Sequence, residues 1–230
     1  MLYKENEMYG PHVLIKCNRP DKYQGVLEIE LCPAKDEAEC ARNSMRWIND
    51  HRVRLFLSSP RPCSLSYEEE WVRNLNKGDD IHWMIYVDGT HVGGVGLHRI
   101  EKEHARADLG IMIGDQDYWG IGLAQVVTAA VVEYAFENII PGGLHKLVGH
   151  VLVGNDHSQG TLEKIGFAKV GVAREHHWHQ GRWYDQWTGE VLKGEWAEMR
   201  EEKFRATGIT YLNIYPGCEE IGFTPAVDGG

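Results

Sequence analysis

The stretch DYWGIGLAQVV, residues 117–127, places two glycines two residues apart at the start of an apolar run. No proline or charged residue follows until Glu133, so the pattern predicts a helix from about Gly122 to Asn138. Glycine is unfavourable inside a helix, and the pair therefore marks where the helix begins. The first N–H groups of a helix have no intrahelical partner, and the helix dipole adds partial positive charge there. The stretch therefore predicts a helix start that favours an anion.

Taken alone, the glycine pair has two interpretations. Gly120 and Gly122 could let a pyrophosphate approach the backbone, or they could let the helix pack tightly on a strand. The pair does not complete a Rossmann fingerprint, because Gln125 occupies the third glycine position, and it lacks the Lys-Ser/Thr of a P-loop. The surrounding sequence has to decide between phosphate binding and packing.

Strand patterns surround the pair. Asp88-Gly89 separates two β-rich runs and predicts a hairpin. The run over residues 106–113 predicts a third strand directly before the glycines. Along the whole chain the expected order is β-α-α-β-β-β-α-β-α-β-β, which indicates an α/β fold with a mixed, mostly antiparallel sheet flanked by helices. We expect residues 1–22 to form an N-terminal arm, 23–196 the domain, and 197–230 a C-terminal helix and tail.

Composition excludes some classes of protein. The chain has 230 residues, of which 43% are hydrophobic, and 34 acidic against 24 basic side chains give a formal net charge of −10. This balance argues against nucleic acid as a partner and is compatible with a cationic amine, although solubility alone is the simpler explanation. Five cysteines without a C-x-x-C pair indicate a reducing, cytoplasmic setting. We expect no membrane partner, because polar residues interrupt the longest apolar tract, GIGLAQVVTAAVVEYAF.

With the glycine turn after three antiparallel strands, the chain resembles the GCN5-related N-acetyltransferase (GNAT) family, and within it the RimJ/RimL-like branch. The family's acetyl-CoA signature, Gln/Arg-x-x-Gly-x-Gly/Ala, compares with the stretch that begins at Trp119. Trp119 departs from the expected polar residue. Four further segments are similar, in order: RWINDHRVRLFL, RADLGIMI, GNDHSQGTLEKIGF and GVAREHHWHQGRWYDQW.

The resemblance implies a GNAT fold that binds acetyl-CoA and needs no metal. It implies that backbone amides of the glycine turn hold the pyrophosphate, namely those of Gly120, Ile121, Gly122, Leu123 and Ala124, with Trp119 beside them. It also implies that the strand carrying Ile111, Met112 and Ile113 pairs with the pantetheine arm, and that an N–H there polarises the thioester carbonyl. Asn155 matches a cofactor-contacting asparagine of the family, although a Gly-Asn turn is its structural alternative.

The implied reaction is direct attack of a primary amine on acetyl-CoA in a ternary complex. Asp108 is the expected base, at a position where related enzymes carry a glutamate, and its structural alternative is a pair with Arg106. Leu162 stands where many members have a thiolate-protonating tyrosine. Ser158 could protonate the thiolate or cap the following helix, and a water could also serve.

The acceptor stays open at this stage. The branch includes enzymes for small cationic amines (polyamines, amino sugars or aminoglycoside-type molecules) and for peptide N-termini. His176, His177 and His179 give too few ligands on one face for zinc, so an aromatic wall or sheet packing explains them better. His82 and His98 could face the acceptor, but no pattern singles them out. The residues after Trp196 could cap the acceptor cleft or mediate a homodimer. The alternative function is a non-catalytic acyl-CoA-binding module, which Leu162 favours.

Overall fold

One mixed sheet organises the protein. The computed structural model describes residues 11–57, 62–179, 181–215 and 221–223. In these residues ten strands form one sheet in the order β10-β9-β1-β2-β3-β4-β5-β6-β8-β7. The strands are β1 His12–Asn18, β2 Val26–Cys32, β3 Ile81–Val87, β4 Thr90–Glu101, β5 Arg106–Ile113, β6 Lys146–Leu152, β7 Ala168–His179, β8 Arg182–Leu192, β9 Ile209–Tyr215 and β10 Ile221–Phe223. The expected α/β fold with a mostly antiparallel sheet is confirmed, since every neighbouring pair except β5–β6 is antiparallel.

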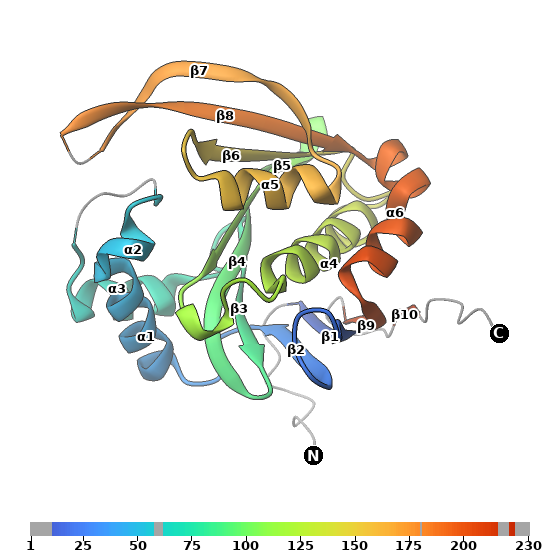
Figure 1. The fold of residues 1–230 in the computed structure, drawn as a ribbon, viewed down its shortest axis with the longest axis horizontal. Helices are drawn as coiled ribbons and strands as arrows, with labels where there is room; N and C mark the ends of the chain where they lie inside the picture. The colour runs from blue at the N-terminus through green and yellow to red at the C-terminus, as the bar shows by residue number, and fades with distance from the viewer. Residues whose placement is uncertain (1–10, 58–61, 180, 216–220, 224–230) are drawn as a thin grey trace.

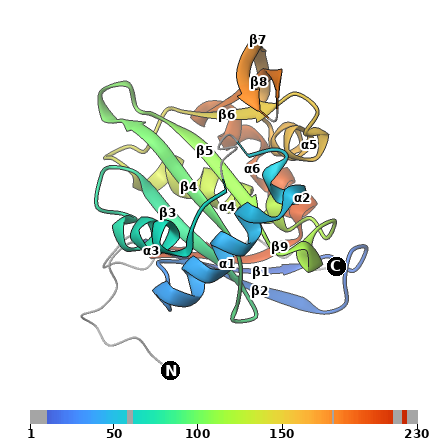
Figure 2. The same cartoon turned by 90° about the vertical axis from the view of Figure 1, so that its left-hand side faces the viewer.

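Helices cover both sides of the central strands. The α-helices are α1 Glu37–Asn49, α2 His51–Arg54, α3 Leu65–Asn74, α4 Leu123–Asn138, α5 Asp156–Ile165 and α6 Lys193–Thr207, with short 3₁₀ turns η1 Lys102–His104 and η2 Gln116–Tyr118. Helices α4 and α6 lie on one side of β3 and β4, and α1, α2 and α3 lie on the other (Figure 1). Figure 2 looks onto the side that α1 and α2 cover.

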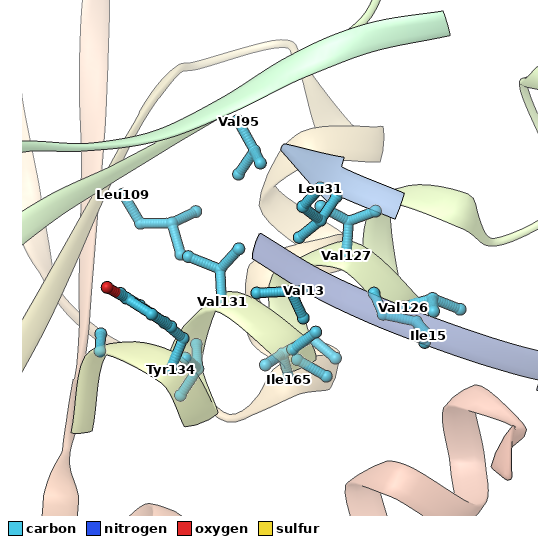
Figure 3. Close-up of a cluster of buried hydrophobic side chains, with 14 of the residues drawn as sticks. Val13, Ile15, Leu31, Val95, Leu109, Val126, Val127, Val131, Tyr134 and Ile165 are labelled. Atoms are coloured by element: carbon cyan, nitrogen blue, oxygen red, sulfur yellow. The ribbon is translucent and has the colours of Figure 1, made fainter. Parts of the chain in front are cut away.

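Helix α4 is the centre of the core. Twelve of its residues are buried, from Leu123 to Phe136, because the helix packs between the sheet and other helices. Figure 3 shows Val127 and Val131 among Val13 of β1, Val95 of β4 and Leu109 of β5. A helix buried all round must be apolar all round, which explains the long apolar tract. No helix in the described residues is long and apolar enough to cross a membrane.

Described strands in both the N-terminal and the C-terminal segment join the sheet, where the sequence predicts an arm and a helix with a tail. Strand β1, within the segment 1–22, pairs with β2 on one side and β9 on the other. Its alternate residues Val13, Ile15 and Cys17 are buried. The segment after residue 196 forms α6 and then β9, whose Leu212 and Ile214 enter the same core. The two segments stabilise each other by pairing across nearly the whole sequence.

The sheet opens between β5 and β6. These two parallel strands pair only from Arg106 opposite Lys146 to Leu109 opposite Gly149. Beyond this point β5 pairs only with β4, up to Ile113 opposite Gly93, while β6 pairs only with β8, up to Leu152 opposite Gln186. One edge of each strand is therefore left without a strand partner, directly before the glycine turn that begins α4.

Candidate functional site

The glycine turn has a backbone conformation that favours glycine. Gly120 has φ 78° and Gly122 φ 85°, the left-handed region that disfavours residues with a Cβ. Gly122 is the N-cap of α4 and offers no side-chain acceptor to the first N–H groups. A Cβ at Gly120 would meet nothing within 4 Å. The glycines are therefore required by the turn, and the open space beside Gly120 leaves the amides accessible to an anion.

Arg19, from the turn between β1 and β2, lies on the start of α4. Its Nη1 is 2.8 Å from the point where a Cβ of Gly122 would stand and donates to Oε1 of Gln125 at 3.3 Å. Its side chain is 14% exposed, and its only ion-pair partner in the described part of the chain is the exposed Asp21. A cation at a helix N-terminus is disfavoured by the dipole. The position of Arg19 is explained if an anionic ligand contacts both the guanidinium and the neighbouring start of the helix.

Arg19 could not be found from the sequence. It lies in the segment expected as an arm, and 106 positions separate it from Gln125. Lys22, in the same turn, lines the cleft that begins at the glycine turn. The chain is acidic overall, yet cations gather here.

Trp119 acts through its indole nitrogen. Nε1 donates to the carbonyl oxygen of Ile113 at 2.8 Å and ties the glycine turn to the end of β5. The N–H and C=O of one strand residue point the same way, and residues two apart share that direction. Gly114 donates to Val92 of β4, so Ile111 and Ile113 turn their backbone groups away from β4. A pantetheine arm would pair with both backbone groups of Ile111 and with the N–H of Ile113, since the carbonyl of Ile113 already accepts from Trp119.

Replacing Trp119 by Phe should weaken acetyl-CoA binding while preserving the fold. The ring remains, but the Ile113 carbonyl loses its donor, and the turn loses its tie to β5. A neutral hydrogen bond contributes about 1 kcal/mol, which corresponds to a rise in the KM for acetyl-CoA of about fivefold. Trp178→Phe, at an exposed tryptophan on β7, is the matched control. An unchanged KM in the Trp119 variant would show that the tie is dispensable.

A cleft of about 1810 Å³ runs from the glycine turn to α3. The expected cofactor residues line it except Ile121, namely Ile111, Met112, Ile113, Trp119, Gly120, Gly122, Leu123, Ala124, Asn155 and Ser158. The side chain of Ile121 packs against the core instead. The structure therefore brings residues from three separate segments to one cavity.

Asn155 caps helix α5, which is one of the two roles expected for Ser158. Asn155 is the N-cap of α5, and its Oδ1 accepts from the backbone N–H of Ser158 at 3.2 Å. Ser158 is therefore not the cap, because it lies inside the helix, which begins at Asp156. Leu162 is buried, and its Cδ1 lies 2.6 Å from the point where a Cβ of Gly149 would stand. Leu162 therefore packs against β6 at the position where many members of the family have a thiolate-protonating tyrosine.

The carboxylate of Asp108 is held by neighbouring side chains. It forms an ion pair with Arg99, and Nε2 of His150 lies 3.4 Å from its Oδ2. Arg106, the expected partner, pairs with Glu101 at 2.8 Å instead. The Asp108 side chain is 18% exposed and is not among the residues that line the cleft, whereas His150 is.

A series of hydrogen-bonded side chains continues from His150 across the sheet. Its Nδ1 contacts Oγ1 of Thr188 at 3.1 Å and Nε2 of Gln186 at 3.0 Å. Oε1 of Gln186 contacts Nε2 of His177 at 2.6 Å. Both nitrogens of His150 thus have partners. His177 serves this chain of hydrogen bonds, and the side chain of His179 lies outside the described part.

His98 lies where the sheet begins to open. Its Nδ1 is 3.7 Å from Oδ2 of Asp80, and its Nε2 is 3.1 Å from the point where a Cβ of Gly110 would stand. Burial lowers the pKa of His98, and the Asp80 carboxylate opposes this shift. No hydrogen-bond partner of Nε2 is found within the described ranges. A neutral imidazole with one free nitrogen therefore lines the cleft.

Comparisons with known proteins identify the family and the fold. The family model described as acetyltransferase (GNAT) domain matches residues 29–168. The uncharacterized N-acetyltransferase YoaA of Bacillus subtilis is 32% identical over 102 residues, which are 44% of this chain and 55% of YoaA. The chain thus spans about half the length of that relative.

Two solved structures have a similar fold. Mycobacterium smegmatis RimJ in complex with CoA-disulfide has a TM-score of 0.69 and 18% identity, covering 85% of this chain and 94% of RimJ. The spermidine N-acetyltransferase of Vibrio cholerae in complex with CoA and spermine has a TM-score of 0.65 and 21% identity, covering 74% of this chain and 98% of that enzyme. At these identities the similarity concerns the fold alone.

Proposed function

Since the chain belongs to the GNAT acetyltransferase family, we propose that it transfers the acetyl group of acetyl-CoA to a primary amine by direct attack in a ternary complex. The observation that carries the proposal is the opening between β5 and β6 directly before the glycine turn. It leaves free backbone groups on β5 and free N–H groups on α4 along one cleft. Acetyl-CoA, when bound, supplies the activated acetyl thioester.

Separate parts of the chain would hold the cofactor. The amides that follow Gly120 and the guanidinium of Arg19 suit the pyrophosphate, because both present positive charge to the same point. The outward-facing groups of Ile111 and Ile113 suit the pantetheine arm. An N–H on this edge would donate to the thioester oxygen and stabilise negative charge there.

For the proton acceptor, access favours His98 over the sequence-derived candidate, Asp108. His98 has a free Nε2 in the cleft, and its lowered pKa keeps it neutral near pH 7. The carboxylate of Asp108 is engaged by Arg99 and His150. We assign removal of the amine proton to His98, and to Asp108 a positioning role through His150.

For the proton donor to the departing thiolate, Ser158 remains our candidate. It lines the cleft one turn before Leu162, where the apolar side chain offers no proton. A water held by the serine hydroxyl would serve the same step.

The acceptor we propose is a small cationic amine. The acidic balance of the chain suits it, and a structural neighbour is named as a spermidine N-acetyltransferase. A peptide N-terminus is the second candidate, because its α-amine, with a pKa of about 7.7–8.0, needs little help from a base. Rates with a panel of polyamines, amino sugars, aminoglycosides and short peptides test this choice. Peptides acetylated faster than every small amine would overturn it.

The alternative is a non-catalytic acyl-CoA-binding module. It is supported by Leu162, which replaces the thiolate-protonating tyrosine of many family members. Both functions require that CoA bind the native state and raise its melting temperature. They differ in turnover alone. A chain that CoA leaves unstabilised has neither function.

A further inference from the structure

Glu68 carries a buried carboxylate at the end of the cleft that α3 lines. It lies on α3 and is 3% exposed, yet it is one of the residues that line the cleft. Resting on the proposed function, we propose that Glu68 binds a second cationic group of the acceptor. The acceptor is then a diamine or polyamine, and Glu68 recognises its second positive charge.

Glu68 lacks the partners that a buried acid needs. The thiol of Cys63 hydrogen-bonds to the carboxylate, but Oε2 has no hydrogen-bond partner among the described residues. Burial raises the pKa of Glu68, and the bond from Cys63 only partly opposes this. An unpaired buried charge is unfavourable, so a cation entering the cleft would be bound favourably.

A second buried glutamate shows how the chain pairs an acid that serves structure. Glu133 of α4 is 7% exposed, and its Oε2 accepts from Trp196 Nε1 at 2.8 Å. Its Oε1 lies 3.1 Å from Arg200 Nη1. Both oxygens of Glu133 are thus satisfied inside the protein. Glu68 instead lines a cavity, and its buried Oε2 has no hydrogen-bond partner among the described residues.

The walls around Glu68 also suit a cation. Trp71, one turn further along α3, is 40% exposed and lines the cleft with Tyr67 and Phe56. Aromatic faces attract ammonium groups. Arg52, which lines this part of the cleft among the described residues, is paired with Asp50 at 2.9 Å, so its charge is balanced locally.

Ring contacts connect this subsite to the proposed base. The Trp71 and His82 rings have centroids 6.0 Å apart, and those of His82 and His98 are 4.6 Å apart. These side chains come from α3, β3 and β4 in turn. An acceptor could therefore present one amine at His98 and hold a second ammonium at Glu68 without leaving the cleft.

The test compares putrescine with butylamine, which share a carbon chain and differ in one ammonium group. Wild type should acetylate putrescine with the lower KM. Glu68→Gln keeps the shape and removes the charge, and should raise the KM for putrescine about tenfold or more while leaving that for butylamine within about twofold. Glu70→Gln, an exposed neighbour on the same helix, is the control and should change neither. Equal changes for both amines would overturn the proposal.

A binding measurement separates this inference from the proposed function. Calorimetry of putrescine with the CoA-loaded full chain needs no acetyl transfer. Tighter binding of putrescine than of butylamine, lost in Glu68→Gln, supports the subsite even if no amine is acetylated. Equal binding of the two amines by wild type overturns it, whatever the activity. This wild-type comparison stands even if the Glu68 variant does not fold.

Discussion

Replacing His98 by Gln is expected to lower kcat by about a hundredfold or more, which is the contribution typical of a general base. The KM for acetyl-CoA should stay near its wild-type value, because His98 lies away from the glycine turn and Arg19. Glutamine keeps a polar group of similar reach but cannot accept the proton. Steady-state rates with a saturating amine measure the loss.

The pH profile identifies the residue responsible. A base acts in its neutral form, so kcat falls as the pH drops through its pKa. Burial, with Arg99 adding to it and Asp80 opposing it, lowers the pKa of His98 from 6.5, and the nearby His82 has its pKa lowered to about 4. The acidic limb of wild type should therefore lie below pH 6.5, and His98→Gln should lack it.

Asp108→Asn distinguishes the two candidate bases. In our account it disturbs Arg99 and His150 and lowers kcat less than His98→Gln, while the acidic limb remains. If Asp108→Asn abolishes turnover and His98→Gln retains the wild-type rate and limb, the base is Asp108.

Replacing Arg19 by Met is expected to weaken CoA binding by about tenfold to a hundredfold, which is the range for a hydrogen bond to a charged group. Methionine keeps an apolar stem over Gly122 but removes the guanidinium. The affinity for CoA should also become less sensitive to salt, because a charge interaction is lost. Calorimetric titration at two salt concentrations measures both effects.

Stability separates binding from structure at Arg19. A cation at the start of α4 opposes the helix dipole, so the variant without ligand should melt no lower than wild type. Lys16→Met removes an exposed cation of β1 that pairs with Glu28, and it should leave CoA affinity unchanged. An Arg19 variant with wild-type affinity would remove this residue from the cofactor site.

Local signals in the sequence predict local structure well here. Asp88 and Gly89 both have positive φ, as the predicted hairpin turn requires. The helix after the glycine turn begins and ends within one residue of its predicted bounds. In each case the deciding residues are neighbours in the chain, so their conformational preferences can be read from a short window.

The features that could not be predicted from the sequence depend on contacts between residues far apart in the chain. Strand β1 is fixed by β9, about 200 positions away. Without that partner, the flanking Gly10, Pro11 and Pro20 suggest an irregular arm. Arg19 reaches α4 only through this pairing. His98 and Asp108 lie opposite each other on β4 and β5, and only the neighbouring side chains reveal that one faces the cleft while the other is engaged. Sequence patterns carry no information on such contacts.

Release of the CoA thiol from acetyl-CoA by the purified full chain, followed with and without a small cationic amine, tests the central claim most directly. We expect release that depends on both the amine and the chain, together with an amine that gains the mass of one acetyl group. Binding of CoA without release for any amine would contradict it and leave the chain an acyl-CoA-binding module.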